Sequence, residues 1–237
     1  MLDFKKFKTV RYQAVLFTPD SEVSSALLSR KLLGKWSERF DADPTAVPNL
    51  PGLPAEVPRL TLTSSSGDYR CEFAPARLSL VWTSQQAFDV EAAPLGVVNS
   101  LALEYAEELS PRVARLAVIV TRVVKDENPG RALSSHFCRD KWLDAPFNRP
   151  ESFEIHSHKK YRTSFGQLVN SWVRSRSGAV REKSGLETAV VTVEQDINTP
   201  GEDMGTADFS PDQISTFLDS STTEFDEILS LYFPEKQ

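Results

Sequence analysis

The sequence lacks the motifs that mark the common enzyme classes. It contains no Gly-X-Gly-X-X-Gly fingerprint, no Walker loop, no Gly-X-Ser-X-Gly elbow and no His-Glu-X-X-His helix. These motifs hold, in turn, dinucleotides, nucleoside triphosphates, an activated serine and a catalytic zinc ion. Their absence argues against dinucleotide oxidoreductases, P-loop NTPases and ordinary serine hydrolases. We therefore expect a protein that needs no cofactor, and we favour a non-enzymatic role over an enzymatic one.

Long apolar runs and cysteines are also scarce. The longest uninterrupted apolar run, residues 116–120, is far shorter than the roughly 20 residues that span a membrane. Residues 1–8 intersperse phenylalanine with lysine and lack the apolar core of a secretory signal, so we expect a cytoplasmic protein with no membrane-spanning helix. The two cysteines, Cys71 and Cys138, are too few for a disulfide framework, and we expect reduced, buried thiols.

The composition is that of an ordinary globular protein, with 237 residues of which 40% are hydrophobic and 25% charged. This length admits one large domain or two smaller units. The net charge of −6 is unevenly distributed, because residues 185–237 carry −11 and the rest of the chain carries +5. Such asymmetry indicates either a cationic partner or an internal match between acidic and basic surfaces.

The first half of the chain predicts a strand, a helix, three strands and a second helix. Apolar residues alternate in the strands and recur with the helical period in the helices. Five prolines within residues 41–58 preclude a helix there and predict an extended connector. The expected ranges are 8–17 (strand), 20–40 (helix), 59–64, 69–74 and 77–83 (an antiparallel meander) and 95–109 (helix).

The second half predicts the same order of elements. Its last helix has the clearest start, because Ser210 suits the N-cap, Pro211 the first helical position and Gln213 a capping box. The expected ranges are 113–124 (strand), 131–138 (short helix), 152–158, 168–174 and 186–193 (strands) and 210–233 (helix). We therefore predict an α+β protein of two repeated strand-helix-three-strand-helix modules, residues 1–110 and 111–237, whose antiparallel sheets are covered by helices.

Three segments together carry a resemblance to a known family. They are an apolar strand around residues 115–124, a strand over 186–197 that ends in Glu194-Gln195-Asp196-Ile197, and a terminal helix with Phe225-Asp226-Glu227-Ile228. In this pattern the chain resembles a sporadically distributed, uncharacterised bacterial protein family over nearly its whole length. It departs from the family at Thr121-Arg122, where an aromatic residue followed by asparagine is expected. The resemblance implies a bacterial protein of unassigned activity, carried on mobile or defence-linked loci, and it transfers no functional residues.

The histidines suggest a metal site. His156 and His158 are expected on the same face of a strand, where two imidazoles can share a metal ion. His136 or Cys138 would complete a zinc site, which predicts a metal-dependent hydrolase; Cys138 beside His136 also allows a cysteine nucleophile. The competing interpretation is an exposed or hydrogen-bonded histidine pair that binds no metal.

Carboxylates gather in residues 194–208, which we interpret as a loop. They are Asp196, Glu202, Asp203 and Asp208, and their oxygen atoms suit a hard cation such as magnesium. The spacing does not match a calcium-binding loop. The alternatives are contact with a basic protein partner and a solvated acidic loop.

A basic segment follows the paired histidines, with aromatic residues among its charges. Such a combination allows phosphate contacts together with base stacking, so it predicts a nucleic-acid-binding surface. A solvated or internally paired surface and a protein-binding surface are the alternatives. We interpret Trp172, which shares a strand face with Leu168 and Asn170, as a candidate core residue. The predicted nucleic-acid contacts are Lys159, Lys160, Tyr161, Arg162, Arg174, Arg176, Arg181 and Lys183.

These observations rank three hypotheses for function. The first is a non-enzymatic binding or accessory protein with a protein partner in a bacterial multi-component system. The second is a nucleic-acid-binding protein that uses residues 159–183, and the third is a metal-dependent hydrolase around His156 and His158. The sequence predicts neither the identity of the partner nor the oligomeric state.

Overall fold

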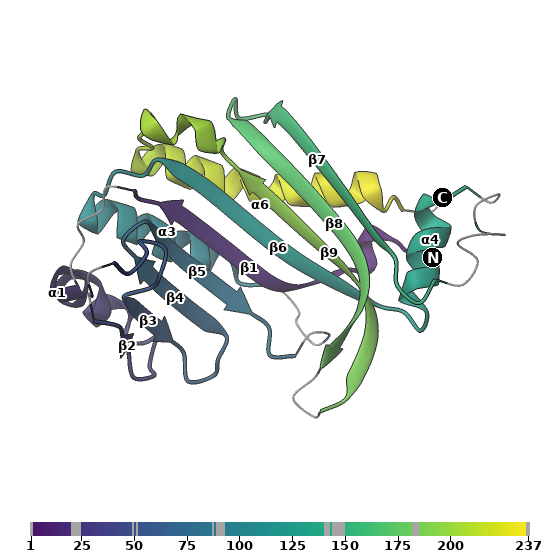
Figure 1. Cartoon of the computed structure of the whole chain (residues 1–237), viewed down its shortest axis with the longest axis horizontal. Coiled ribbons are helices and arrows are strands. Elements are labelled where there is room, and N and C mark those ends of the chain that lie inside the picture. Colours follow the sequence, from purple (N-terminus) through teal and green to yellow (C-terminus); the bar gives the residue numbers. More distant parts are fainter. Residues whose placement is uncertain are drawn as a thin grey trace.

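The computed structural model describes residues 2–19, 25–48, 50, 52–86, 88, 93–139, 143, 150–181 and 185–235. This part of the chain forms an α+β structure, as the sequence predicts (Figure 1). The strands are β1 (Lys8–Phe17), β2 (Thr45–Ala46), β3 (Leu60–Thr63), β4 (Tyr69–Ala74), β5 (Arg77–Thr83), β6 (Arg115–Lys125), β7 (Glu154–Arg162), β8 (Leu168–Arg181) and β9 (Glu187–Asn198).

All of these strands belong to one nine-stranded antiparallel sheet. Its order is β2-β3-β4-β5-β1-β6-β9-β8-β7, so β1 and β6 pair at its centre. The meander β3-β4-β5 joins the free side of β1, and the meander β7-β8-β9 joins the free side of β6. The chain therefore builds a single continuous sheet from strands of both its halves.

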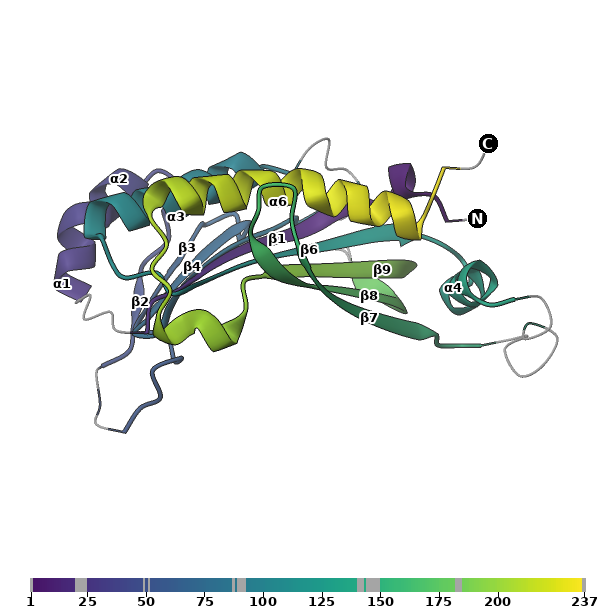
Figure 2. The same ribbon diagram turned by 90° about the horizontal axis from the view of Figure 1, so that it is seen from above.

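The two long helices lie side by side on the same face of the sheet. They are α3 (Leu95–Leu109) and α6 (Pro211–Tyr232), and both run above the strands in Figure 2. The shorter helical segments are η1 (Phe4–Lys6), α1 (Ser25–Leu28), η2 (Ser29–Leu33), α2 (Gly34–Trp36), α4 (Pro129–Phe137) and η3 (Gly201–Gly205). No helix in the described ranges is long and apolar enough to cross a membrane.

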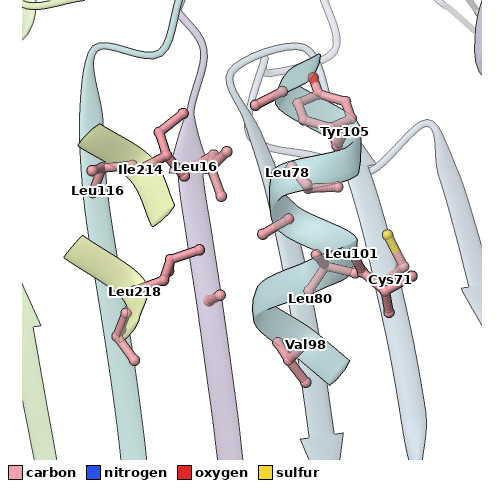
Figure 3. Close-up of a cluster of buried hydrophobic side chains, with 14 of the residues drawn as sticks. Leu16, Cys71, Leu78, Leu80, Val98, Leu101, Tyr105, Leu116, Ile214 and Leu218 are labelled. Carbon is pink, nitrogen blue, oxygen red and sulfur yellow. The ribbon is translucent and has the colours of Figure 1, made fainter. Parts of the chain in front are cut away.

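The main core lies between the sheet and these helices. Strand residues that point to the helices alternate with residues that point away, as Tyr12, Ala14 and Leu16 do on β1. Burying such a leucine or phenylalanine side chain contributes about 1.5–3 kcal/mol relative to leaving it exposed. Core side chains from the strands and both helices meet in Figure 3 at Leu16, Leu78, Leu80, Leu116, Val98, Leu101, Tyr105, Ile214 and Leu218.

The start of α6 confirms the prediction made from its sequence. The Ser210 hydroxyl accepts a hydrogen bond from the backbone amide of Gln213, and the Gln213 side chain accepts one from the amide of Ser210. Two amides of the first turn are thereby satisfied, and Pro211 occupies a position that needs no donor. This cap fixes the helix end next to η3.

The first helical region ends earlier than predicted. The described helical residues run from Ser25 to Trp36 and include the π-helical stretch Ser29–Leu33. The expected start at residue 20 or 21 lies outside the described residues. Phe40, expected within the helix, lies in the following turn, where its amide donates to the Trp36 carbonyl, and its side chain is buried.

Three strands are longer than predicted. β7 continues to Arg162, β8 to Arg181 and β9 to Asn198. The prediction of a loop from residue 194 is therefore wrong for residues 194–198, which are paired with both β6 and β8. The carboxylates of Glu194 and Asp196, which suggested a loop, face away from the helices, where polar side chains are tolerated in a strand.

Candidate binding face

The sheet face turned away from α3 and α6, here called the open face, carries the candidate site. The α-helices of the described residues pack on the other face. The segment η3 borders the open face, where its Glu202 pairs with Lys160 of β7. Strand register places one row of side chains across the open face, from β7 to β4. That row is His158, Trp172, Asp196, Ile119, Gln13, Val81 and Arg70.

At the β7 end of the row, two aromatic rings are stacked. The rings of His158 and Trp172 have centroids 4.1 Å apart and planes inclined by 14°. The Arg174 guanidinium lies 5.9 Å from the Trp172 ring centroid. The interpretation of Trp172 as a core residue is wrong, because β8 buries the opposite side chains, Val169 and Val173, beneath the helices. Trp172 is instead half-buried on the open face.

Asp196 occupies the middle of the row, between Trp172 on β8 and Ile119 on β6. Burial by these neighbours raises the pKa of its carboxyl group, although a hydrogen bond from Asn198 (Nδ2 to Oδ1, 2.8 Å) acts in the opposite direction. Arg115 and Arg174 also oppose the rise. The site therefore holds a carboxylate that is partly desolvated and whose ionisation costs more than in water.

The predicted acidic group is not assembled by the fold. Asp196 lies in β9, Glu202 and Asp203 are exposed in η3, and Asp208 is exposed beyond it. Glu202 instead forms an ion pair with Lys160 of β7. The four carboxylates thus lie in different local environments. The prediction of one acidic loop that holds all of them is wrong.

Several charges on the open face are matched by neighbouring charges. Arg174 Nη1 lies 3.0 Å from Glu194 Oε1. The His156 ring shares a hydrogen bond with Glu154 (Nε2 to Oε1, 2.6 Å). Two ion pairs join the basic segment to the acidic C-terminal region, Lys160–Glu202 and Arg174–Glu194. The charge asymmetry of the sequence is therefore partly an internal match.

The residues predicted to contact nucleic acid do not form one surface. Lys160, Arg162, Arg174 and Arg176 project from the open face, because they share the parity of His158 and Trp172 in the register. Lys159 and Tyr161 project from the other face, with the Lys159 ammonium 4.8 Å from the Tyr161 ring centroid.

Tyr161 and Arg181 lie apart from the four open-face side chains of that set. The Tyr161 hydroxyl donates to Glu224 Oε1 at 2.6 Å, and burial together with this bond raises the pKa of Tyr161. Arg181 lies opposite Glu187 at the far end of β8. Lys183 is outside the described residues.

The fold separates the predicted zinc ligands. His156 and His158 lie on the open face, whereas α4 holds His136 beneath the C-terminal end of α6. His136 Nε2 is 2.7 Å from the Tyr232 carbonyl oxygen, and its ring stacks on Phe233 with centroids 4.9 Å apart. Within the described ranges, no three side chains of His, Cys, Asp or Glu are grouped as a metal site requires.

Both cysteines are free thiols. Cys71 is buried in the main core, as predicted, and burial raises the pKa of its thiol. Cys138, which follows α4, is only half-buried, so the expectation of a buried thiol is wrong there.

The first half of the chain adds a polar hollow to the open face that the sequence did not indicate. It encloses about 480 Å³ over β1, β4 and β5. Arg11 Nη2 donates to Gln13 Oε1 at 2.8 Å, and Gln13 Nε2 donates to Ser79 Oγ at 2.9 Å, within its lining. The polar residues that alternate with apolar ones on β1 were the only feature of the sequence that could have indicated this hollow. The order of the strands in the sheet is what brings them beside Arg70 and Glu72.

The helix-covered side has the opposite electrostatic character. The long helices α3 and α6 together contain eight acidic residues and no lysine or arginine. The basic side chains of β7 and β8 on the open face therefore lie across the sheet from an acidic helical layer. Such a separation orients the molecule in the field of a charged partner.

No protein-family model matches this chain, and no curated protein shows significant similarity to it.

Proposed function

We propose that this chain is a non-enzymatic binding or accessory subunit that holds a protein partner on its open face. The observation that supports this function is the run of half-buried side chains on that face, which are Trp172, Asp196, Ile119, Gln13 and Val81. Aromatic residues and arginines surrounded by polar groups are typical of protein interfaces. The open face combines Trp172 with Arg174 in this way.

The setting of this function is a bacterial multi-component system, of the mobile or defence-linked kind. The support is the family resemblance of the strand and helix segments noted in the sequence. An accessory role agrees with a face that presents side chains for contact over several strands.

We also propose that residues 1–110 and 111–237 are copies of one module. What supports the repeat is the arrangement of the strands around the central pair. β5, β4 and β3 succeed one another beside β1 in the same way that β9, β8 and β7 do beside β6. Each half ends in a long helix, α3 or α6, on the same face.

The function is tested by purifying the tagged protein at native expression level and identifying the proteins that accompany it. The decisive variant is Arg174→Glu/Arg176→Glu, which reverses two exposed charges on the open face. Its matched control, Arg30→Glu/Arg131→Glu, makes the same change of charge at exposed helical positions. We expect the open-face variant to lose a partner that the control retains. A partner retained equally by both variants contradicts the proposal.

The second candidate is binding of single-stranded nucleic acid on the same face. The observation that favours it is the stacked pair His158 and Trp172 beside Arg174 and Arg176, since bases stack on aromatic rings while arginines contact phosphates. Titration with single-stranded RNA and DNA at low salt tests it, because phosphate contacts make affinity strongly salt-dependent. Absence of binding at low salt excludes this candidate.

The third candidate, a metal-dependent hydrolase, has less support, because His136 and Cys138 lie away from His156 and His158. Metal analysis of the purified protein beside its His156→Ala/His158→Ala variant tests it. Stoichiometric zinc in the unmodified protein that is absent from the variant would support the hydrolase.

A further inference from the structure

The strand β7 forms a long free edge of the sheet. It contains nine residues and is the last strand in the sheet order, paired with β8. At the opposite edge, β2 contains only two residues. A long edge presents a row of backbone donors and acceptors to which another strand can pair, whereas a very short edge does not.

Two hydrogen bonds define which backbone groups of β7 face outward. At one end of the hairpin the Ser177 amide donates to the Phe153 carbonyl at 3.0 Å, and at the other the Thr163 amide donates to the Gln167 carbonyl at 2.9 Å. Both bonds follow the register of the β7–β8 pairs. Because hydrogen-bonded and non-hydrogen-bonded pairs alternate in an antiparallel ladder, the odd-numbered residues of β7 bond to β8.

The even-numbered residues therefore direct their amide and carbonyl groups away from the sheet. In the part of the chain that the structure describes, no hydrogen bond occupies these outward groups. The same residues place their side chains on the open face, and all are exposed. They are Glu154, His156, His158, Lys160 and Arg162.

The charge of this edge selects the kind of strand that it can accept. On its open face one carboxylate, Glu154, stands against the charges of Lys160 and Arg162, although Glu202 of η3 also pairs with Lys160. Arg176 of β8 adds a further exposed positive charge. On the other side of the strand, Ile155 is 36% exposed and stands two residues from Ser157. A segment that alternates acidic with apolar residues would match both sides, because cross-strand neighbours of opposite charge attract.

A second copy of the chain fits this edge poorly. It would bring the same excess of positive side chains, including Lys159 and Lys160, and lysines on an edge are a common means of preventing a strand from pairing with its own kind. The same repulsion favours a partner of opposite charge. The acidic strand is therefore preferred over self-association.

We propose that β7 binds an extended acidic segment of the partner protein, which adds a tenth strand to the sheet. This inference rests on the proposed function and specifies the partner's chemistry and its mode of binding. Backbone hydrogen bonds would provide affinity, and alternate acidic side chains over Lys160 and Arg162 would provide selectivity.

The probe is a fluorescent peptide of about nine residues, the length of β7, that alternates glutamate with valine. Its controls are the same peptide with alternate backbone amides methylated, and a version with lysine in place of glutamate. We expect the acidic peptide to bind the full chain at roughly 0.15 M salt, and each control peptide to bind at least about tenfold more weakly. Equal binding of the methylated peptide would contradict strand addition.

A matched pair of proline variants tests the edge itself. His156→Pro removes an outward amide and leaves the β8 ladder intact, whereas Ser157→Pro removes an amide bonded to β8. We expect His156→Pro to fold and to lose at least about tenfold in peptide affinity, while His156→Ala retains it. Ser157→Pro is expected to lower stability. Undiminished binding to folded His156→Pro would overturn the inference.

Two further outcomes separate this inference from the function on which it rests. Reversible dimers in sedimentation without peptide, abolished by His156→Pro, would assign the edge to a second copy and reject the acidic strand. If the native partner is lost from Arg174→Glu/Arg176→Glu but retained by His156→Pro, the edge proposal fails and the binding function stands. If neither variant changes the set of co-purified proteins while the acidic peptide still binds β7, the function on the open face fails instead.

Discussion

Arg122 is buried beneath α6, yet the carboxylate with which it pairs, Asp226, is exposed. Their side chains are 6% and 71% accessible, and Arg122 Nη2 lies 2.5 Å from Asp226 Oδ1. The same guanidinium donates to Gln195 Oε1 at 2.6 Å, to the Phe225 carbonyl at 3.3 Å and to Thr9 Oγ1 at 3.3 Å. Burial lowers the pKa of Arg122, and Asp226 opposes that change. One side chain thus links three strands to the last helix.

Replacing this arginine should destabilise the fold strongly. We expect Arg122→Met to lower the free energy of unfolding by about 3 kcal/mol, because it leaves the buried Gln195 and Phe225 acceptors with fewer donors. Asp226→Asn should cost much less, since Asp226 is exposed and the other bonds of Arg122 remain. Urea denaturation of both variants provides the measurement. Equal losses would show that the ion pair, rather than the buried bonds, carries the stability.

Two glycines should respond in opposite ways to alanine. A Cβ atom at Gly130 in α4 would clash with the Pro150 carbonyl oxygen and lie 3.0 Å from that of Glu151. Gly130→Ala therefore forces the backbone to move and should cost more than about 1 kcal/mol. At Gly34 in α2 a Cβ atom would meet nothing within 4 Å.

Gly34→Ala is therefore the control, and it should leave stability unchanged or raise it by up to about 1 kcal/mol through helix propensity. Thermal and urea unfolding of both proteins give the comparison. The same sign of change for the two substitutions would refute the close approach at Gly130.

The pH dependence of stability should reveal Asp196. Its folded pKa is raised, chiefly by burial, so the protonated carboxyl contributes stability below its unfolded pKa of about 3.9, and this contribution is lost as the pH rises through the folded pKa. We expect Asp196→Asn to be more stable than the unmodified protein at pH 7, with a difference that shrinks as the pH falls toward 4.

Glu202→Gln is the control with the opposite sign. The hydrogen bond and charge of Lys160 lower the pKa of Glu202, so its contribution is present at neutral pH and is lost as the pH falls through the folded pKa. This variant should be less stable than the unmodified protein at pH 7, and the difference should vanish in acid. Urea titrations across this range measure both differences, and parallel pH profiles would contradict the assignment.

Tyr12 forms a buried polar link between the sheet and α3. Its hydroxyl donates to Asn99 Oδ1 at 2.7 Å, and Asn99 Nδ2 donates to Asp219 Oδ1 on α6 at 3.2 Å. Tyr12→Phe should lower the free energy of unfolding by about 1–2 kcal/mol, because it leaves a buried acceptor without its donor. Tyr161→Phe, which loses a partly exposed bond to Glu224, should cost less. Chemical denaturation of both variants measures the two losses of stability. A larger loss for Tyr161→Phe than for Tyr12→Phe would contradict the prediction and place the more important hydrogen bond at the sheet edge.

Strict patterns in the sequence predict the central elements well. The alternation within Lys8–Phe17 predicts β1 at its observed bounds, since Tyr12, Ala14 and Leu16 on one of its faces are buried. The capping box at Ser210 predicts the start of α6 because it depends only on residues close in sequence. Local signals suffice for both elements.

The ends of β8 and β9 could not be predicted in this way. Arg176 and Asp196 are polar residues that suggest a loop, but each lies on the strand face that the described helices leave uncovered, where polar side chains are allowed. Whether the face of β8 that carries Trp172 or the opposite face is buried depends on where α6 packs. The position of α6 on the sheet is a matter of tertiary packing, which local sequence patterns do not reveal. For the same reason, proximity in sequence did not reveal that His136 and His158 lie on different sides of the sheet.

The pairing of β1 with β6 at the centre of the sheet has a consequence for synthesis. As the nascent chain leaves the ribosome, β1 can pair with β5 as soon as residues up to Thr83 have emerged. Its other edge has to wait for Arg115–Lys125. An apolar strand with an unpaired edge invites association with other chains. During that interval the β6-facing edge of β1 is the part of the growing sheet most open to mispairing.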